Sequence, residues 1–223
     1  MTGAGAEIPI PAGDVSLQGM LGEPPAGAGI VVFVHGSGSS RHSPRNQMVA
    51  QLLREAGMGT LLFDLLTPEE EQVDMVTRHL RFDIELLTER LLAVTDWLVE
   101  QRGGQSPIGY IGSSTGAAAA LIAAARTRHR IDAVVSRGGR PDLAGEALER
   151  VRAATLLIVG GQDVQVLELN QLAFDQLDCE KQLAVVPGAT HLFEEPGKLE
   201  DAAALARDWF LAYLPSTGKS ETI

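Results

Sequence analysis

The sequence predicts an α/β protein in which helices cover both faces of a mainly parallel β-sheet. Short apolar runs rich in Val and Ile, such as residues 29–34, alternate along the chain with longer segments that carry apolar residues at helical spacing. Strands that alternate with helices imply right-handed crossovers and therefore parallel neighbours. Neither a repeat nor a long linker interrupts this order, so we expect residues 1–223 to form a single domain, with about residues 1–6 and 216–223 flexible.

The elements can be assigned in order along the chain. Segments 7–10 and 15–21 alternate around Pro11 and Gly13, which predicts an antiparallel hairpin at a sheet edge. Apolar runs predict buried strands at residues 29–34, 60–63, 108–113, 132–136, 154–160 and 183–186. Helices are expected from Ser43-Pro44 to the stop at Gly57, at 81–100 with Phe82 on the buried face, as a short helix within 137–153, and at 167–177 and 199–213.

Two connections bear on the shape of a site. The segment 67–79, with its run Glu69-Glu70-Glu71, is interpreted as a solvated loop or helix start. No sizeable insertion separates the strands at 132–136 and 154–160, so we expect no lid domain and a site open to small or extended substrates.

Composition excludes several function classes. The chain has 223 residues and 45% hydrophobic content, and its net charge of −11 argues against nucleic acid or an anionic membrane as partner. The single cysteine, Cys179, rules out an intramolecular disulfide and a cysteine zinc site, and we interpret it as a small packed residue. We see no signal peptide and no apolar run of roughly 18 residues, so a soluble cytoplasmic protein is expected. The oligomeric state stays open.

A serine between two glycines is the main candidate for chemistry. In Gly112-Ser113-Ser114-Thr115-Gly116, the glycines lie two residues on either side of Ser114, between a predicted strand and an alanine-rich helix. A tight strand-to-helix turn strains the residue at its apex and needs small neighbours at these two positions. The pattern therefore predicts a nucleophile elbow with Ser114 as the nucleophile and Ser113 at the variable position. A packed turn serine is the alternative.

A serine nucleophile needs a histidine base and an acid that orients the base. His191 follows the last predicted strand, at the carboxyl end of the sheet where Ser114 also lies. By contrast, His79 and His129 lie in charged helical stretches, and His35 is expected to support the glycine turn after it. Asp163 emerges just past the strand at 154–160, which makes it the predicted acid, with Asp64 in reserve.

The oxyanion formed at the attacked carbonyl needs two N–H donors. We assign the backbone N–H of Thr115, directly after the nucleophile, and that of Ser37 in the loop after the first buried strand, with Gly38 as an alternative. The glycines of this loop could also suggest phosphate binding, but the loop lacks the Gly-Lys-Ser/Thr sequence of a nucleotide site.

Two basic clusters lie on loops predicted at the catalytic edge, namely Arg41 to Arg45 and Arg137 to Arg140. Arg41 and Arg140 are our candidate contacts for an anionic group of the substrate, because arginine binds carboxylate or phosphate in a bidentate fork. Surface ion pairing or helix capping is the alternative interpretation.

Taken together, these motifs resemble the α/β-hydrolase superfamily, and within it the small dienelactone hydrolase-like branch. The resemblance covers about residues 31–214 and rests on His35-Gly36-Ser37-Gly38, the Ser114 elbow, Gly161-Gln162-Asp163 and Ala189-Thr190-His191, in the family order Ser, Asp, His. It implies a cofactor-free hydrolase with the triad Ser114, Asp163 and His191, and we identify no metal site. Dienelactone hydrolases proper carry a cysteine where Ser114 stands, which favours a carboxylesterase-like activity on a small ester.

The hypothesis from the sequence is therefore a serine hydrolase that cleaves a small carboxylic ester or lactone through an acyl-enzyme. Two alternatives stay open, because a fold does not fix a function. One is a non-catalytic ligand-binding or interaction module. The other is an acyltransferase, which differs only in how the acyl-enzyme is resolved.

Overall fold

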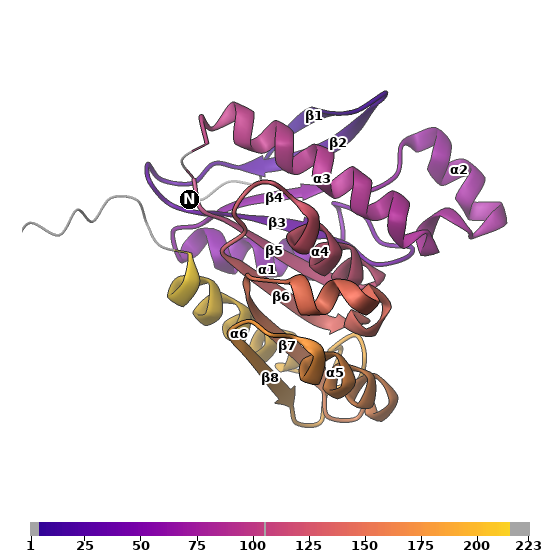
Figure 1. Cartoon of the computed structure of the whole chain (residues 1–223), viewed down its shortest axis with the longest axis vertical. Helices are drawn as coiled ribbons and strands as arrows, with labels where there is room; N and C mark the ends of the chain where they lie inside the picture. The colour runs from indigo at the N-terminus through magenta and orange to yellow at the C-terminus, as the bar shows by residue number, and fades with distance from the viewer. Residues whose placement is uncertain (1–4, 105, 215–223) are drawn as a thin grey trace, which may run out of the picture.

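The computed structural model describes residues 5–104 and 106–214 and shows an eight-stranded sheet with helices on both faces (Figure 1). The predicted fold class is confirmed. The elements are β1 (Ala6–Ala12), β2 (Val15–Gly22), β3 (Ile30–Val34), α1 (Pro44–Glu55), β4 (Gly59–Phe63), α2 (Pro68–Thr77), η1 (Leu80–Phe82), α3 (Ile84–Gln101), β5 (Ile108–Ser114), α4 (Thr115–Arg126), β6 (Ala133–Gly139), η2 (Pro141–Arg150), β7 (Ala154–Gly160), α5 (Val164–Gln176), β8 (Lys181–Val186) and α6 (Lys198–Tyr213).

The sheet order is β1-β2-β4-β3-β5-β6-β7-β8. β2 pairs antiparallel with β1 on one side and with β4 on the other. All pairs from β4-β3 to β7-β8 in this order are parallel. β3, β4, β6 and β7 are buried along their whole length, as continuous apolar runs predict. The edge hairpin and the strands expected from the sequence are thus confirmed, with bounds that match for β7 and shift by up to three residues elsewhere.

Two hydrophobic layers flank the sheet. One layer packs residues of α3, α4, η2 and α5 against one face, and the other packs α1 and α6 against the opposite face (Figure 1). Alternation along a strand divides its side chains between the layers, so Val32 and Val34 belong to the first and Val31 and Phe33 to the second. Because the central strands are parallel, their carboxyl ends all lie at the same end of the sheet, where a site can form.

Segment 67–79 is more ordered than a solvated loop. Residues 68–77 form helix α2, which starts with a capping box between Thr67 and Glu70 and has Pro68 at its first turn. The sequence Thr67-Pro68-Glu69-Glu70 carried this signal. The expectation that Phe82 lies on a buried face was wrong: its side chain is 58% exposed, because η1 turns it out before α3 begins at Ile84.

The connection between β6 and β7 holds only η2, a 3₁₀ helix kinked at Gly145, where a short helix was expected. Gly145 has a φ of 51°, which breaks the helical path. The expectation of flexible ends falls mostly outside the described residues, although Ala6 already belongs to β1. Within the part of the chain that the structure describes, no helix combines the length and apolar character needed to span a membrane.

Candidate active site

The turn from β5 to α4 has the geometry of a nucleophile elbow. Ser114 ends β5 with φ 50° and ψ −125°, a conformation that is strained for a residue with a Cβ, and α4 begins at the next residue. A Cβ at Gly116 would lie well under 3.0 Å from the carbonyl oxygen of Val34, and one at Gly112 would lie 2.7 Å from the nitrogen of Ala117. The two glycines are therefore required by close backbone approach, as the motif predicts.

Asp163 and His191 are in direct contact. His191 Nδ1 lies 2.6 Å from Asp163 Oδ2. An ionised carboxylate only accepts hydrogen bonds, so Nδ1 carries the proton in this pair and leaves Nε2 free to accept one. Asp163 occupies the N-cap position of α5, but its side chain makes no capping hydrogen bond, so the carboxylate faces the imidazole instead.

The loops that carry this pair are joined by their backbones. The Gln162 N–H donates to the carbonyl of Ala189 at 2.9 Å, and a Cβ at Gly160 would lie 2.6 Å from the carbonyl oxygen of Thr190. The loop after β7 and the loop after β8 therefore pack against each other, and Gly160 permits the close approach. This packing explains why two residues 28 positions apart meet.

Glu195 secures the histidine loop, although none of the sequence motifs predicted a role for it. The N–H of Thr190 donates to Glu195 Oε2 at 3.0 Å and its hydroxyl donates to Oε1 at 2.6 Å. The hydroxyl and then the N–H of Thr190 hold the pKa of the Glu195 carboxyl below its usual value of 4.5. Its position four residues after His191, in a Gly-Ala-Thr-His loop, is the only signal that the sequence offers.

Ser114 and His191 line one cavity of about 250 Å³ at the carboxyl ends of the strands. Gly36, Ser37 and Phe193 belong to the same lining. A Cβ at Gly36 would lie 2.8 Å from the Cβ of Ser114, so the loop after β3 approaches the elbow more closely than a residue with a side chain would allow. The structure thus brings the predicted nucleophile, base and acid to one place.

The two residues assigned to the oxyanion site also meet. Ser37 Oγ lies 3.2 Å from Thr115 Oγ1, and the Ser37 hydroxyl donates to the carbonyl of Arg81 at 3.3 Å. These contacts hold the loop after β3 beside the start of α4. The N-terminus of a helix carries partial positive charge, which favours an oxyanion next to Thr115.

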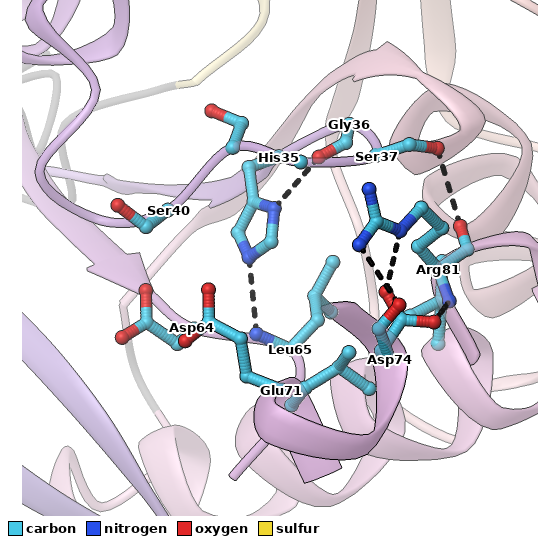
Figure 2. A pocket seen from close by; sticks show the side chains of 13 residues that line it. His35, Gly36, Ser37, Ser40, Asp64, Leu65, Glu71, Asp74 and Arg81 are labelled. Carbon is cyan, nitrogen blue, oxygen red and sulfur yellow. Dashed lines mark hydrogen bonds and ion pairs between the residues drawn. The ribbon is translucent and has the colours of Figure 1, made fainter. Parts of the chain in front are cut away.

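Behind this loop lies a second, mostly apolar pocket (Figure 2). His35 spans it: its Nε2 accepts the N–H of Leu65 at 3.1 Å and its Nδ1 donates to the carbonyl of Gly36 at 3.0 Å. Burial lowers the pKa of His35, which keeps the ring neutral and suited to this pair of bonds. Figure 2 also shows Arg81 turned toward Asp74, with which it forms an ion pair. The interpretation of His35 as a support for the glycine turn agrees with these contacts.

The other histidines lie elsewhere. His79 is exposed and contacts Thr77, and His129 pairs with Asp96 at 2.7 Å. The reserve acid Asp64 is bound by the Arg41 side chain and by the Arg41 N–H at 2.7 Å. Cys179 is partly buried, with its Sγ 3.6 Å from Thr155 Oγ1.

The structure does not bring the two candidate anion contacts to the Ser114 cavity. Arg41 is held by Asp64 and by Glu7, and Arg140 forms a bidentate pair with Asp142 at 2.7 and 2.8 Å. The ion-pair alternative describes both of them. The arginines that do line the cavity are Arg45 and Arg137.

Arg137 was assigned to a loop because β6 was expected to end at Ser136. The strand in fact runs to Gly139, so Arg137 lies inside it and shares a face with Ala133 and Val135. The two-residue alternation of Ala133, Val135 and Arg137 was the signal that could have located it. Among residues 5–104 and 106–214, no cluster of three His, Cys, Asp or Glu residues could hold a metal ion.

Comparison with known proteins agrees with this geometry. A family model described as alpha/beta hydrolase fold matches residues 29–182, which hold the elbow and the acid. The chain belongs to the α/β-hydrolase family. A crystal structure of a dienelactone hydrolase from Anabaena variabilis is 52% identical, with a TM-score of 0.93 over 96% of this chain and 100% of that one. The dienelactone hydrolase-like branch suggested by the motifs is thereby confirmed.

Three further relatives differ in what they show. Est1E from Butyrivibrio proteoclasticus is 18% identical, with a TM-score of 0.77 over 92% of this chain and 98% of that one, and supports the α/β-hydrolase fold alone. Two curated proteins of Mycobacterium tuberculosis are 59% identical over 215 residues, and their names give phosphoribosyl transferase as a provisional activity. The match covers 96% of this α/β-hydrolase but 48% of those proteins, so the chain spans about half of their length.

Proposed function

We propose that this chain is a serine hydrolase that cleaves a small carboxylic ester or lactone through an acyl-enzyme on Ser114. The observation that carries the proposal is the 2.6 Å contact between His191 Nδ1 and Asp163 Oδ2, made at a cavity that His191 shares with a strained Ser114. A serine hydroxyl is inert at neutral pH unless a base accepts its proton and an acid fixes the tautomer of that base.

The reaction follows from these roles. Ser114 Oγ attacks the ester carbonyl carbon while His191 Nε2 takes the hydroxyl proton, and the N–H groups of Ser37 and Thr115 stabilise the oxyanion. His191 returns the proton to the leaving alkoxide as the carbon–oxygen bond breaks. Water then adds to the acyl-enzyme by the same route and releases the acid and free Ser114.

The relatives inform the choice of substrate. The Anabaena variabilis structure, titled as a dienelactone hydrolase, supports testing lactones beside simple esters. Because only η2 separates β6 from β7, we expect short or extended esters to be preferred. A preference for long-chain emulsified lipids would contradict that expectation. Ser114, His191 and Asp163 suit acyl chemistry better than phosphoribosyl transfer, and the chain matches only about half the length of the proteins named for that activity.

The proposal is tested by turnover of a panel of nitrophenyl esters and lactones with wild type and Ser114→Ala. We expect the substitution to lower kcat by several orders of magnitude with the fold retained, since the nucleophile is lost. Ser106→Ala, at the opposite end of β5, is the matched control and should retain activity. Activity of Ser114→Ala within tenfold of wild type would refute the assignment. Binding without turnover in wild type would favour an interaction module, and transfer to an added alcohol in preference to water would favour an acyltransferase.

A further inference from the structure

Arg137 is a buried cation with no anionic partner among the described residues. Arg137 is only 7% exposed. Its Nη2 donates hydrogen bonds to Asn46 Oδ1 at 2.7 Å and to Ser113 Oγ at 3.0 Å. Both acceptors are neutral. Nη1 is buried and has no hydrogen-bond partner within residues 5–104 and 106–214. A buried guanidinium is costly unless an anion accompanies it, so the arrangement points to an anion from outside the chain.

Other features of positive charge converge on the same cavity. Arg45 and Arg137 both line it, as do Ser43 and Asn46 at the start of α1. Ser43 caps α1, and the first turn of this helix contains no acidic residue that would offset its positive end. Within the described residues, Arg45 forms an ion pair only with Glu194, at 3.2 Å, and the two side chains are 40% and 62% exposed, so this ion pair is weak and can yield to a ligand.

The charge of Arg137 persists at neutral pH. Burial, and secondarily the nearby charge of Arg45, lower the pKa of Arg137 to about 10, which still leaves the guanidinium protonated near pH 7. Asn46 and Ser113 both accept hydrogen bonds from Nη2 of the guanidinium, which leaves Nη1 as the unsatisfied donor.

We propose that Arg137, Arg45 and the N-terminus of α1 form a subsite for an anionic oxyacid group, a carboxylate or a phosphate, carried by the ester that Ser114 attacks. Ser114 and His191 line the same cavity as this subsite. Its role in substrate specificity therefore rests on the proposed function. The substrate class narrows from any small ester to one with a second, anionic group. A guanidinium fork matches both oxyacids, so the experiment separates the two.

Binding is tested without turnover, in the Ser114→Ala protein. Inorganic phosphate and succinate are titrated at constant ionic strength while Tm is followed, with chloride as reference. We expect Tm to rise with at least one oxyanion, and adding Arg137→Gln to abolish the rise. Arg140→Gln, a nearby arginine already paired with Asp142, should leave the rise unchanged. No rise with either oxyanion, or an equal rise with Arg137→Gln, would overturn the subsite. If Arg137→Gln fails to fold, Arg45→Gln replaces it and should reduce the rise.

Kinetics test the specificity in the active enzyme. Nitrophenyl esters of matched length are compared that end in a carboxylate, a phosphonate or a neutral methyl group. We expect kcat/KM for one anionic ester to exceed that of the neutral ester, and Arg137→Gln to lower this ratio roughly 10- to 100-fold, the range of a charge-assisted hydrogen bond. Arg137→Lys, which keeps the charge without the fork, should retain part of the ratio.

The outcomes separate the two proposals. An equal loss on anionic and neutral esters in Arg137→Gln would mean that Arg137 only positions Ser113, and would overturn the subsite. A wild type without esterase activity that still gains Tm from phosphate or succinate through Arg137 would refute the proposed function and support the anion site. The better of the two anionic esters identifies the oxyacid.

Discussion

The contact between Asp163 and His191 makes Asp163→Asn the most informative single substitution. Nδ1 of His191 lies 2.6 Å from the carboxylate, and the Asp163 side chain is only 17% exposed. A carboxylate accepts only, so it holds the proton on Nδ1. The asparagine amide can turn its NH₂ toward the ring and then stabilises the tautomer with the proton on Nε2, which cannot accept the proton of Ser114.

The substitution keeps the size of the side chain and removes both the tautomer control and the charge that stabilises the imidazolium. We expect kcat to fall about 10³- to 10⁴-fold, as tautomer reversal does in serine proteases. At roughly 1.4 kcal/mol per decade this is about 4–5.5 kcal/mol of transition-state stabilisation.

The assay is initial-rate hydrolysis of a short nitrophenyl ester, with the fold checked by circular dichroism and Tm. Asp178→Asn, at an exposed position in the segment after α5, is the matched control. It should change kcat less than about twofold, because substitutions at remote surface sites have small effects. The reasoning is refuted if folded Asp163→Asn keeps kcat within tenfold of wild type, or if Asp178→Asn loses as much.

Three further predictions concern the scaffold. Gly116→Ala should lower the free energy of unfolding by more than about 2 kcal/mol, because a Cβ would press on the Val34 carbonyl, and an unchanged urea midpoint would contradict this. Because burial lowers the pKa of His35, the unfolded chain binds its proton first, so stability present above pH 6.5 should fall as pH drops, by at most about 1.4 kcal/mol per unit. Urea titrations from pH 7.5 to 5 measure this slope, and His35→Gln should flatten it; equal slopes would sink the argument. Thr95→Val leaves the buried Tyr110 hydroxyl, 2.6 Å from Thr95 Oγ1, without this partner and should cost about 1–3 kcal/mol by urea denaturation, whereas wild-type stability would mean that the bond contributes nothing net.

The sequence predicted the fold well because local and global signals agree along this chain. Continuous apolar runs such as residues 29–34 are typical of strands buried on both faces, and the Gly112–Gly116 spacing matches the steric needs of a tight strand-to-helix turn. Asp163 and His191 could be chosen because each follows a strand of a parallel sheet, and the carboxyl ends of such strands share one edge.

The arginines could not be assigned in the same way. Arg137 lies in a loop if β6 ends at Ser136, as predicted, and inside the strand if β6 ends at Gly139, as observed. Such strand ends are set by tertiary pairing, here with β5. Arg41 and Arg140 also looked suitable from sequence. Glu7 and Asp64, the partners of Arg41, come into reach only in the folded chain, whereas Asp142 lies two residues after Arg140 and is a local ion-pair partner. Long flexible side chains on loops take the nearest carboxylate, and the sequence does not rank those distances.

Phe82 illustrates a second limit. Its spacing fits the apolar face of α3, yet the Asp83 side chain caps that helix by accepting the N–H of Leu86, which starts α3 one turn later. The cap fixes the start of α3 at Ile84, so Phe82 lies in η1, outside the helix whose apolar face the periodicity describes.

The most direct test of the central claim is labelling with a fluorophosphonate probe followed by peptide mass spectrometry. The probe reacts with a serine only where a base has activated the hydroxyl and an oxyanion site receives the phosphoryl oxygen. We predict one adduct per chain, on the peptide that contains Ser114, and none in Ser114→Ala. A folded wild-type protein that stays unlabelled, or that is labelled on Ser37 or Ser113 instead, would contradict the account.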